Sequence, residues 1–256
     1  MIEPSEARIA SPVQGPSINF LLIALIFTAL GVAIGTGSAA GSGAAFVFVM
    51  AGWVLSLCLH EFGHAFVAWR GGDTDIPATG YLSLDPRLYA DPLSTIVLPL
   101  VFTILGGIGF PGGSVFVNRE RLRGRVWQSA MSAAGPAMNV LCLLFLMLLY
   151  RLSGEDSDTL RAVIAVSALF QGTAIVLNLL PIPGLDGYGI LRPWLPAAVV
   201  ASGDRLALYS GLVLTGLFLF SSAFGRTLLR ASLYLTTLLG FGSADVGAGY
   251  NLIRLW

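Results

Sequence analysis

The stretch Leu57-Cys58-Leu59-His60-Glu61-Phe62-Gly63-His64-Ala65-Phe66 contains an H-E-x-x-H motif. It lies inside an apolar run over residues 44–69, which is long enough to cross a bilayer as one helix. On a helix, His60 and His64 lie one turn apart on one face and can share a metal ion, with Glu61 in reach of a water on that ion. The chain contains 2 histidines, and both belong to the motif. Charged groups in the centre of a membrane helix cost at least about 2.5 kcal/mol each, and a bound metal compensates that cost.

The composition of the whole chain agrees with a membrane location for this helix. Hydrophobic residues make up 55% of the 256 residues and charged residues 11%, with a mean hydropathy of +0.81. Soluble proteins carry about 25% charged residues, so this chain has too little charge to cover a surface that faces water. We therefore expect the lipid bilayer as its surroundings. The formal net charge is +0 and every basic residue is arginine, which excludes the polybasic footprint of a nucleic-acid-binding protein.

Further apolar stretches lie on both sides of the motif, at residues 18–34, 130–150, 160–180 and 206–224, with a shorter one of open depth at 227–239. We expect an all-α polytopic membrane protein with about six transmembrane helices, forming a single membrane-embedded domain over residues 1–256. Residues 71–91 are polar and rich in turn formers, so we expect a small β-hairpin near the active site. Residues 92–110 are apolar but short and interrupted by Pro99, which predicts a re-entrant or short apolar segment.

The motif supplies two metal ligands, and a catalytic zinc site needs a third protein ligand. The chain has no third histidine, and the glutamates outside the motif all lie outside the apolar spans. Asp186 is better placed, since it directly follows the span at residues 160–180 in the sequence Asn178-Leu-Leu-Pro-Ile-Pro-Gly-Leu-Asp186-Gly. The two prolines end the helix and the glycines permit a tight turn back toward the bilayer. We therefore predict that His60, His64 and Asp186 bind Zn²⁺.

These residues resemble the site-2 protease family of intramembrane zinc metalloproteases. The resemblance rests on His60-Glu61-Phe62-Gly63-His64, then Gly135-Pro136-Ala137-Met138-Asn139, then Asn178 through Asp186-Gly187, and it covers about half of the chain. It implies zinc held by His60, His64 and Asp186, and Glu61 as the general base. It also implies that Asn178 contacts the substrate backbone or the oxyanion. Asn139 has the same implied role, with a polar contact between two helices as the alternative.

The spacing of the motifs indicates a minimal member of that family. Only residues 151–159 separate the helices that bear the second and third motifs, which leaves no room for a PDZ domain, and no CBS pair follows the last apolar stretch. The regulation of cleavage, the substrate and the oligomeric state are not determined by these features.

The metal ligands also constrain the topology. The histidines near the end of one helix can meet Asp186 beyond the end of another only if an odd number of crossings lies between these two helices. We therefore expect that residues 92–110 do not cross and that Asp73 and Arg121 lie on the same side. The arginines at 119, 121, 123 and 125 place that side in the cytoplasm by the positive-inside rule. This predicts a multi-pass protein of a prokaryotic plasma membrane with its active site toward the cytoplasm.

Two hypotheses for function follow. The first is an intramembrane zinc endopeptidase of regulated intramembrane proteolysis, which cleaves a transmembrane segment of a single-pass membrane protein. Its unwound substrate would pair with a strand edge in residues 71–91 or 114–118. The alternative is a non-catalytic membrane metalloprotein, either a pseudoprotease or a metal-handling transporter. An intact Glu61 and the lack of internal repeats favour the first hypothesis.

Overall fold

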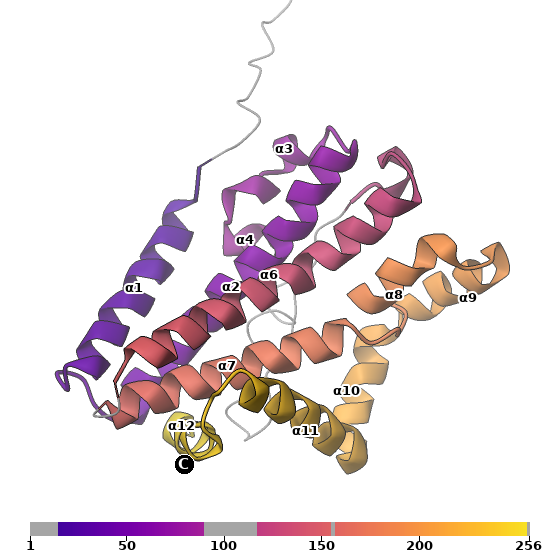
Figure 1. The fold of residues 1–256 in the computed structure, drawn as a ribbon. Helices are drawn as coiled ribbons and strands as arrows, with labels where there is room; N and C mark the ends of the chain where they lie inside the picture. The colour runs from indigo at the N-terminus through magenta and orange to yellow at the C-terminus, as the bar shows by residue number, and fades with distance from the viewer. Residues whose placement is uncertain (1–14, 90–116, 155–156, 255–256) are drawn as a thin grey trace, which may run out of the picture.

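The computed structural model describes residues 15–89, 117–154 and 157–254, and every regular element in these ranges is a helix. Four long helices form the main bundle (Figure 1): α1 (Ile18–Gly35), α2 (Ser42–Gly71), α6 (Arg125–Leu152) and α7 (Asp158–Asn178). Shorter elements follow α2 and precede α6: α3 (Ile76–Thr79), η1 (Tyr81–Ser83), α4 (Pro86–Tyr89) and η3 (Arg119–Arg121). The C-terminal part contains α8 (Asp186–Leu191), η4 (Arg192–Trp194), α9 (Ala197–Ala207), α10 (Ser210–Phe220), α11 (Ser222–Leu238) and α12 (Ser243–Ile253).

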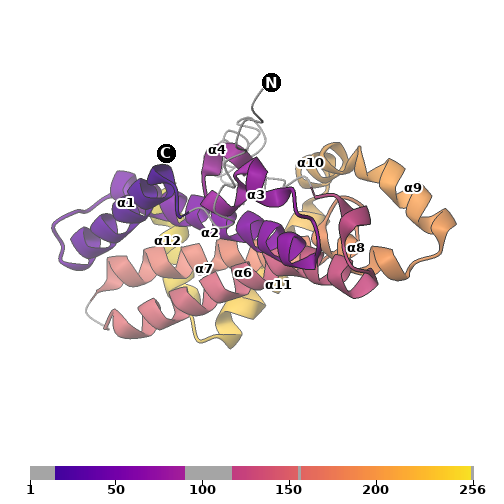
Figure 2. The same cartoon turned by 90° about the horizontal axis from the view of Figure 1, so that it is seen from above.

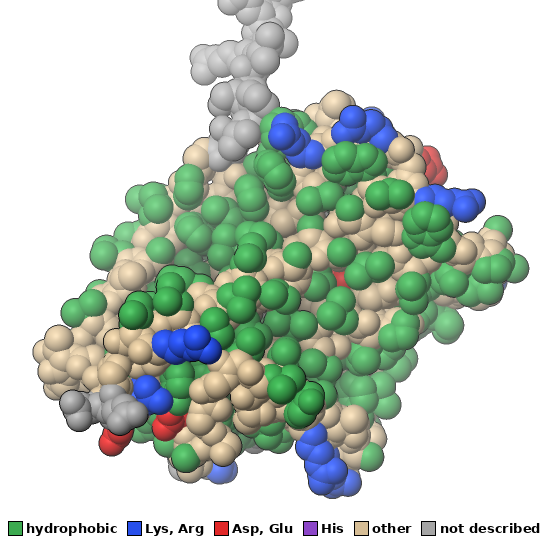
Figure 3. Space-filling view, in the orientation of Figure 1, with side chains coloured by type: hydrophobic (Ala, Val, Ile, Leu, Met, Phe, Trp, Pro, Cys, Tyr) green, Lys and Arg blue, Asp and Glu red, His purple; other side chains and the backbone are tan. Residues whose placement is uncertain are grey.

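Four of the described helices, α1, α2, α6 and α7, are long and apolar enough to cross a membrane. The pair α9 and α10, bent by 65°, would make a fifth span if it crosses as one unit. Residues 227–238 belong to α11, which is shorter than these spans at 17 residues. The described residues therefore contain four or five candidate spans where about six were expected. Hydrophobic side chains cover the middle of the face in Figure 3, and charged side chains gather toward its margins, as in a multi-pass membrane protein.

Helix α7 is the centre of the bundle and contacts α2, α6, α11 and α12. All its residues from Ala162 to Ile175 are buried, so they show no amphipathic pattern. Figure 2 shows α1 at one end of the molecule and α8 to α10 toward the other. The main core joins α2, α6 and α7 through buried side chains that include Phe48, Trp53, Leu143, Ile164 and Phe170. An apolar cavity of about 260 Å³ lies between α1, α2, α6 and α7.

The predicted β-hairpin is wrong for the part of residues 71–91 that the structure describes. Residues 76–89 form α3, η1 and α4, and no strand occurs among the described residues. Pro77 and Pro86 each lie in the first turn of a helix. The N–H that proline lacks would have no partner within the helix there, and the fixed φ of proline suits a helix. The strand edges proposed for substrate binding are therefore absent here. Residues 92–110, the predicted re-entrant segment, and 114–116 lie outside the described residues.

The end of α2 is joined directly to the segment that starts α6. The backbone N–H of Arg123 donates to Gly71 O at 2.9 Å, and that of Asn118 donates to Asp73 Oδ2 at 2.9 Å. Arg121 forms an ion pair with Asp75 and lies 4.0 Å from Asp73. Asp73 and Arg121 are thus in contact and lie on the same side of the bundle, as the parity argument predicts.

Candidate metal centre

The structure brings together the three predicted metal ligands. His60 and His64 lie on α2, and Asp186 is the first residue of α8; their ligand atoms all lie within 4.8 Å of one another. The Nε2 atoms of His60 and His64 are 3.1 Å apart, and each is 3.3 Å from one oxygen of Asp186. The histidines are only 7% and 8% exposed. The prediction that Asp186 would lie beside both imidazoles is confirmed.

Asp186 reaches the histidines because α8 turns back against the end of α7. A Cβ atom at Gly187 would lie 2.5 Å from the carbonyl carbon of Leu179 and 2.5 Å from the oxygen of Leu180. No side chain fits in that space, so only glycine permits this return. The turn carries Asp186 back over the bundle, as expected from its prolines and glycines.

Both histidines present Nε2 to the centre of the cluster, because each Nδ1 has a partner elsewhere. His64 Nδ1 lies 2.7 Å from Met131 O, and His60 Nδ1 is hydrogen-bonded to Asn139 Oδ1. A backbone carbonyl only accepts, so His64 carries its proton on Nδ1 and its Nε2 has a free lone pair. Hydrogen-bond partners of this kind hold the ring orientation of metal-ligating histidines in zinc proteins.

The chemistry of this donor set fits zinc. Two imidazole lone pairs and a carboxylate converge at 3.1–3.3 Å, and acceptors at that distance repel one another unless a cation or proton lies between them. Two nitrogen ligands and one carboxylate, with a position left open, make a typical catalytic zinc site. His60, His64 and Asp186 are therefore the residues that could hold the ion.

Helix α6 contacts the histidines through bare backbone at Gly135. A Cβ atom at this position would lie 2.6 Å from both Cε1 and Nε2 of His60, and closer still to His64 Nε2. Any side chain there would occupy the space between the ligands. Gly135 and Asn139, both from the second motif, thus make room for the histidines and contact one of them.

The remaining predicted site residues are buried in the same part of the bundle. Glu61 follows His60 on α2 and is 3% exposed. Asn178 is the last residue of α7 and is 6% exposed. Asn139 is 4% exposed, and its amide bonds to His60 and Gln171, which supports its alternative role as a contact between helices. The catalytic role of Glu61 and the substrate contacts of Asn178 and Asn139 stay predictions.

Residues that the sequence did not single out also belong to the site. Gln171 and Ser56 extend the hydrogen bonding of Asn139, and Met131 contributes its carbonyl to His64. Gln171 could have been identified from the sequence, because an amide in the middle of an apolar span is costly unless it has a hydrogen-bond partner. Ser56 and Met131 could not, since serine and methionine are ordinary residues in such helices.

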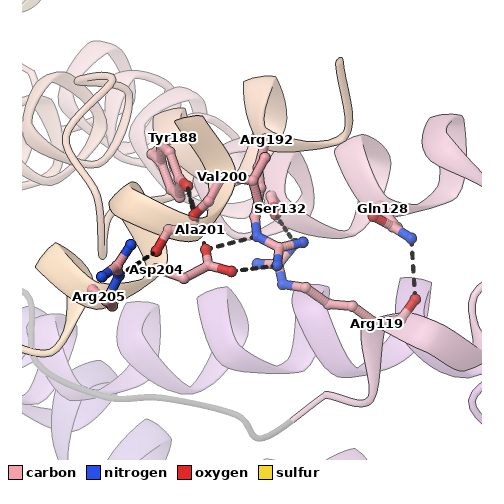
Figure 4. Close-up of polar contacts among 9 residues, drawn as sticks. All are labelled: Arg119, Gln128, Ser132, Tyr188, Arg192, Val200, Ala201, Asp204 and Arg205. Atoms are coloured by element: carbon pink, nitrogen blue, oxygen red, sulfur yellow. Dashed lines mark hydrogen bonds and ion pairs between the residues drawn. The ribbon is translucent and has the colours of Figure 1, made fainter. Parts of the chain in front are cut away.

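Polar contacts hold α8 against α6 and α9 (Figure 4). Arg192 donates to both carboxylate oxygens of Asp204 at 2.9 and 2.5 Å, and Tyr188 OH lies 3.3 Å from the same carboxylate. On the other side, Ser129 Oγ of α6 donates to Ile190 O of α8 at 2.7 Å. These contacts restrain the short helix that carries Asp186.

Comparisons with known proteins agree with the site. The chain is 40% identical over 250 residues to a Mycolicibacterium smegmatis protein named "Putative zinc metalloprotease Rip2", covering 94% of each chain. It is 42% identical over 221 residues to the Mycobacterium tuberculosis protein of that name, covering 82% of this chain and 81% of that one. A Bacillus subtilis protein named "Putative zinc metalloprotease YwhC" is 29% identical over 177 residues, which cover 64% of this chain and 77% of that one.

No family model and no solved structure matches the chain. The relatives named as zinc metalloproteases nevertheless cover nearly the whole sequence, and the two histidines and the aspartate of the motifs meet in space. The chain belongs to the site-2 protease family of zinc metalloproteases.

Proposed function

We propose that this chain is an intramembrane zinc endopeptidase that cleaves a transmembrane segment of a single-pass, membrane-anchored substrate in regulated intramembrane proteolysis. The observation that carries the proposal is the buried cluster of His60, His64 and Asp186 inside a bundle of span-length helices. His64 lies seven residues before the end of α2 at Gly71, about 10 Å along the helix. A peptide bond would therefore have to reach the site within the membrane.

The residues of the chain supply the parts of a hydrolytic mechanism. Zinc, held by the two Nε2 atoms and the Asp186 carboxylate, would supply Lewis acidity toward water and the scissile carbonyl. Glu61 would take the proton of the attacking water and deliver it to the leaving amine. Asn178 would donate a hydrogen bond from its amide to the substrate carbonyl. The substrate helix must unwind first, because its carbonyls are engaged in its own hydrogen bonds.

We further propose that the site faces the cytoplasmic side of a prokaryotic plasma membrane. The end of α2 that lies nearer the site is hydrogen-bonded to the segment that contains the four arginines at 119–125. Arginines in short loops favour the cytoplasmic side. The loop between α6 and α7 would then face outward.

The proposal is tested by replacing Glu61 with Gln, which keeps the size of the side chain and removes the base. The matched control is Glu120→Gln, since Glu120 lies on the exposed turn η3. Wild type and both variants are reconstituted in liposomes with a panel of single-pass transmembrane peptides, and bound zinc and cleavage are measured. We expect all three to retain zinc and Glu61→Gln to cleave at least about a hundredfold more slowly than the others.

Other outcomes would contradict parts of the proposal. Normal turnover by Glu61→Gln would reject Glu61 as the base. Zinc binding without cleavage by the wild type, both on the panel and in membranes of cells that express it, would support the non-catalytic metalloprotein. Absence of bound zinc from the wild type would reject the metal site itself.

A further inference from the structure

A continuous chain of side-chain hydrogen bonds connects His60 to the backbone of its own helix two turns earlier. Asn139 Oδ1 bonds to His60 Nδ1, and Asn139 Nδ2 donates to Gln171 Oε1 at 2.9 Å. Gln171 Nε2 then donates to Ser56 Oγ at 2.6 Å, and Ser56 Oγ donates to Trp53 O at 2.8 Å. This series of hydrogen bonds passes from α2 to α6, then to α7, and back to α2. It therefore joins the three central spans around one metal ligand.

The direction of every bond follows from its far end. A carbonyl can only accept, so the Ser56 hydroxyl must donate to Trp53 O and accept from the Gln171 amide nitrogen. Gln171 consequently presents its oxygen to Asn139, whose nitrogen donates to it. Asn139 is then left with its oxygen facing His60, which must carry a proton on Nδ1. The lone pair of His60 Nε2 is thereby directed at Asp186 and His64.

Burial makes this directionality strong. Ser56, Asn139 and Gln171 are 5%, 4% and 3% exposed, so water does not compete with these bonds. Reversing one amide would leave two acceptors or two donors facing each other inside the membrane, where an unsatisfied polar group is expensive. His64 has no such dependence, because the main-chain carbonyl of Met131 holds it.

We propose that Gln171 and Ser56 are positioning residues that fix the tautomer and orientation of His60 for zinc. This inference rests on the proposed zinc site and adds to it two residues outside the motifs. It assigns a purpose to a buried glutamine in the central span, which would otherwise be a cost to membrane insertion. Loss of a direct hydrogen-bond partner of a metal-ligating histidine, which is the place of Asn139 here, lowers metal affinity by about 10- to 100-fold in zinc proteins.

The test compares variants that differ only in hydrogen bonding. Gln171→Met keeps the volume of the side chain and removes both amide bonds, while Gln171→Glu in its neutral form can still accept from Asn139 and donate to Ser56. Ser56→Ala removes the far end of the chain. Its matched control is Ser167→Ala. Ser167 is also buried, and with Ser56 it lines the cavity between α1, α2, α6 and α7. Its hydroxyl donates to the backbone of its own helix, at Val163 O, over 2.7 Å.

Zinc affinity is measured by chelator competition in the full-length detergent-solubilised chain. We expect Gln171→Met to bind zinc about tenfold more weakly, at the low end of that range because Gln171 acts on His60 through Asn139. Ser56→Ala should weaken binding in the same direction by less. Gln171→Glu should restore affinity toward the wild-type value, and Ser167→Ala should leave it unchanged. Thermal unfolding of each variant separates these effects from a general loss of stability.

A second readout uses the fact that the chain contains only 2 histidines. In zinc-loaded protein labelled with ¹⁵N-histidine, both Nδ1 protons should be protected from exchange in the wild type. In Gln171→Met only the His60 proton should lose protection, with His64 as an internal control. Unchanged zinc affinity and His60 protection in both Gln171→Met and Ser56→Ala would overturn the inference while leaving the protease proposal intact. A wild type that binds no zinc would overturn both this inference and the proposed zinc protease, and its lack of cleavage would accompany that result.

Discussion

Gly135 is the residue on which the space around the metal ligands depends. Its missing side chain lets the backbone of α6 approach the imidazoles of His60 and His64 directly. The three ligands are also held by other groups. Asn139 and Met131 bond to the Nδ1 atoms of the two histidines, and the return of α8 holds Asp186. The two imidazoles could therefore not shift away from a methyl group at this position without losing these contacts.

We expect Gly135→Ala to lower zinc affinity by at least about tenfold, since overpacking a filled site costs about 1–3 kcal/mol. Alanine itself favours a helix more than glycine, so the loss would come from the site and not from α6. Gly216→Ala in α10 is the control, because a Cβ atom there meets nothing within 4 Å. Chelator competition measures the affinity. Equal zinc binding by the two variants would show that the ligands can shift away from α6.

At the scale of elements, the metal site joins α2 to the short helix α8. Six residues cannot form a stable helix alone, so α8 depends on its contacts with α6 and on the link from Asp186 to α2. Bound zinc would add to that link, because a ligand that binds only the folded state stabilises it by about 2.7 kcal/mol at a concentration of 100 times its Kd.

Removal of zinc by a chelator should therefore lower the Tm and raise hydrogen exchange in residues 179–191 above that in α7. Asp186→Asn should show little response to the chelator, because it removes the charged ligand that joins α8 to the site. The comparison is made by mass spectrometry on the full chain with and without zinc. Identical exchange of residues 179–191 in both states of the wild type would contradict the link.

A second contact between elements holds the start of α1 against α4. Asn19 Nδ2 lies 3.1 Å from both oxygens of Asp85, and the backbone N–H of Ser17 donates to Ser83 O at 2.7 Å. Hydrogen bonds from Arg87, its backbone N–H and Asn19 hold the pKa of Asp85 below its ordinary value. Most of α1 faces outward, with Ile34 its buried residue, so this contact anchors an otherwise exposed helix.

Because the pKa of Asp85 is lowered in the folded state, its contribution to docking is complete above the unfolded pKa of about 4. It is lost as the pH falls from there through the lower folded pKa. Hydrogen exchange at the start of α1 should therefore rise when the pH is lowered through that range, after correction for the intrinsic exchange rate. Asp85→Asn should show the faster exchange already at neutral pH and lose the acid response. A wild type with the same corrected exchange at neutral and acidic pH would exclude Asp85 as the anchor.

At the scale of the whole molecule, the topology follows from contacts toward one end of the bundle, where α2 ends and α6 begins. Asp73 after α2 and Arg121 before α6 are in contact, so both lie on one side, and a single span, α6, then leads to the loop before α7. Asp186 follows α7 and returns to the side of the histidines. Between α2 and α7 only α6 crosses after this contact, and this odd count satisfies the parity of the metal ligands.

Single cysteines test this topology in a chain that lacks Cys58 and Cys142. Thr74, Glu120 and Asp158 are exposed and suit labelling, whereas Asp73 is buried. We expect an impermeant thiol reagent to label positions 74 and 120 from the same side and position 158 from the other, in right-side-out and inverted membrane vesicles. By the positive-inside rule, 74 and 120 should be labelled in the inverted vesicles. Labelling of 74 and 120 from opposite sides would reject the topology.

The sequence by itself determined the class of the protein and the three candidate metal ligands that the structure brings together. The apolar runs had to become helices, because only helices satisfy their backbone within a single span in lipid. His60, His64 and Asp186 were identifiable because few other ligands exist in so apolar a chain. The β-hairpin predicted for residues 71–91 is wrong for the part that the structure describes, since proline and glycine indicate a turn without saying whether short helices or strands flank it.

Only the tertiary structure decided how the ligands are held. Asn139, Gln171 and Ser56 are separated by 32 and 115 residues along their hydrogen bonds, and no local pattern relates such positions. The clearance at Gly135 and the return of Asp186 at Gly187 likewise depend on the approach of neighbouring backbone. Periodicity reports which face of a helix is apolar, but when nearly every face is apolar it does not report which helix lies opposite. That choice is made by packing, and here packing selects the partner of each buried polar group.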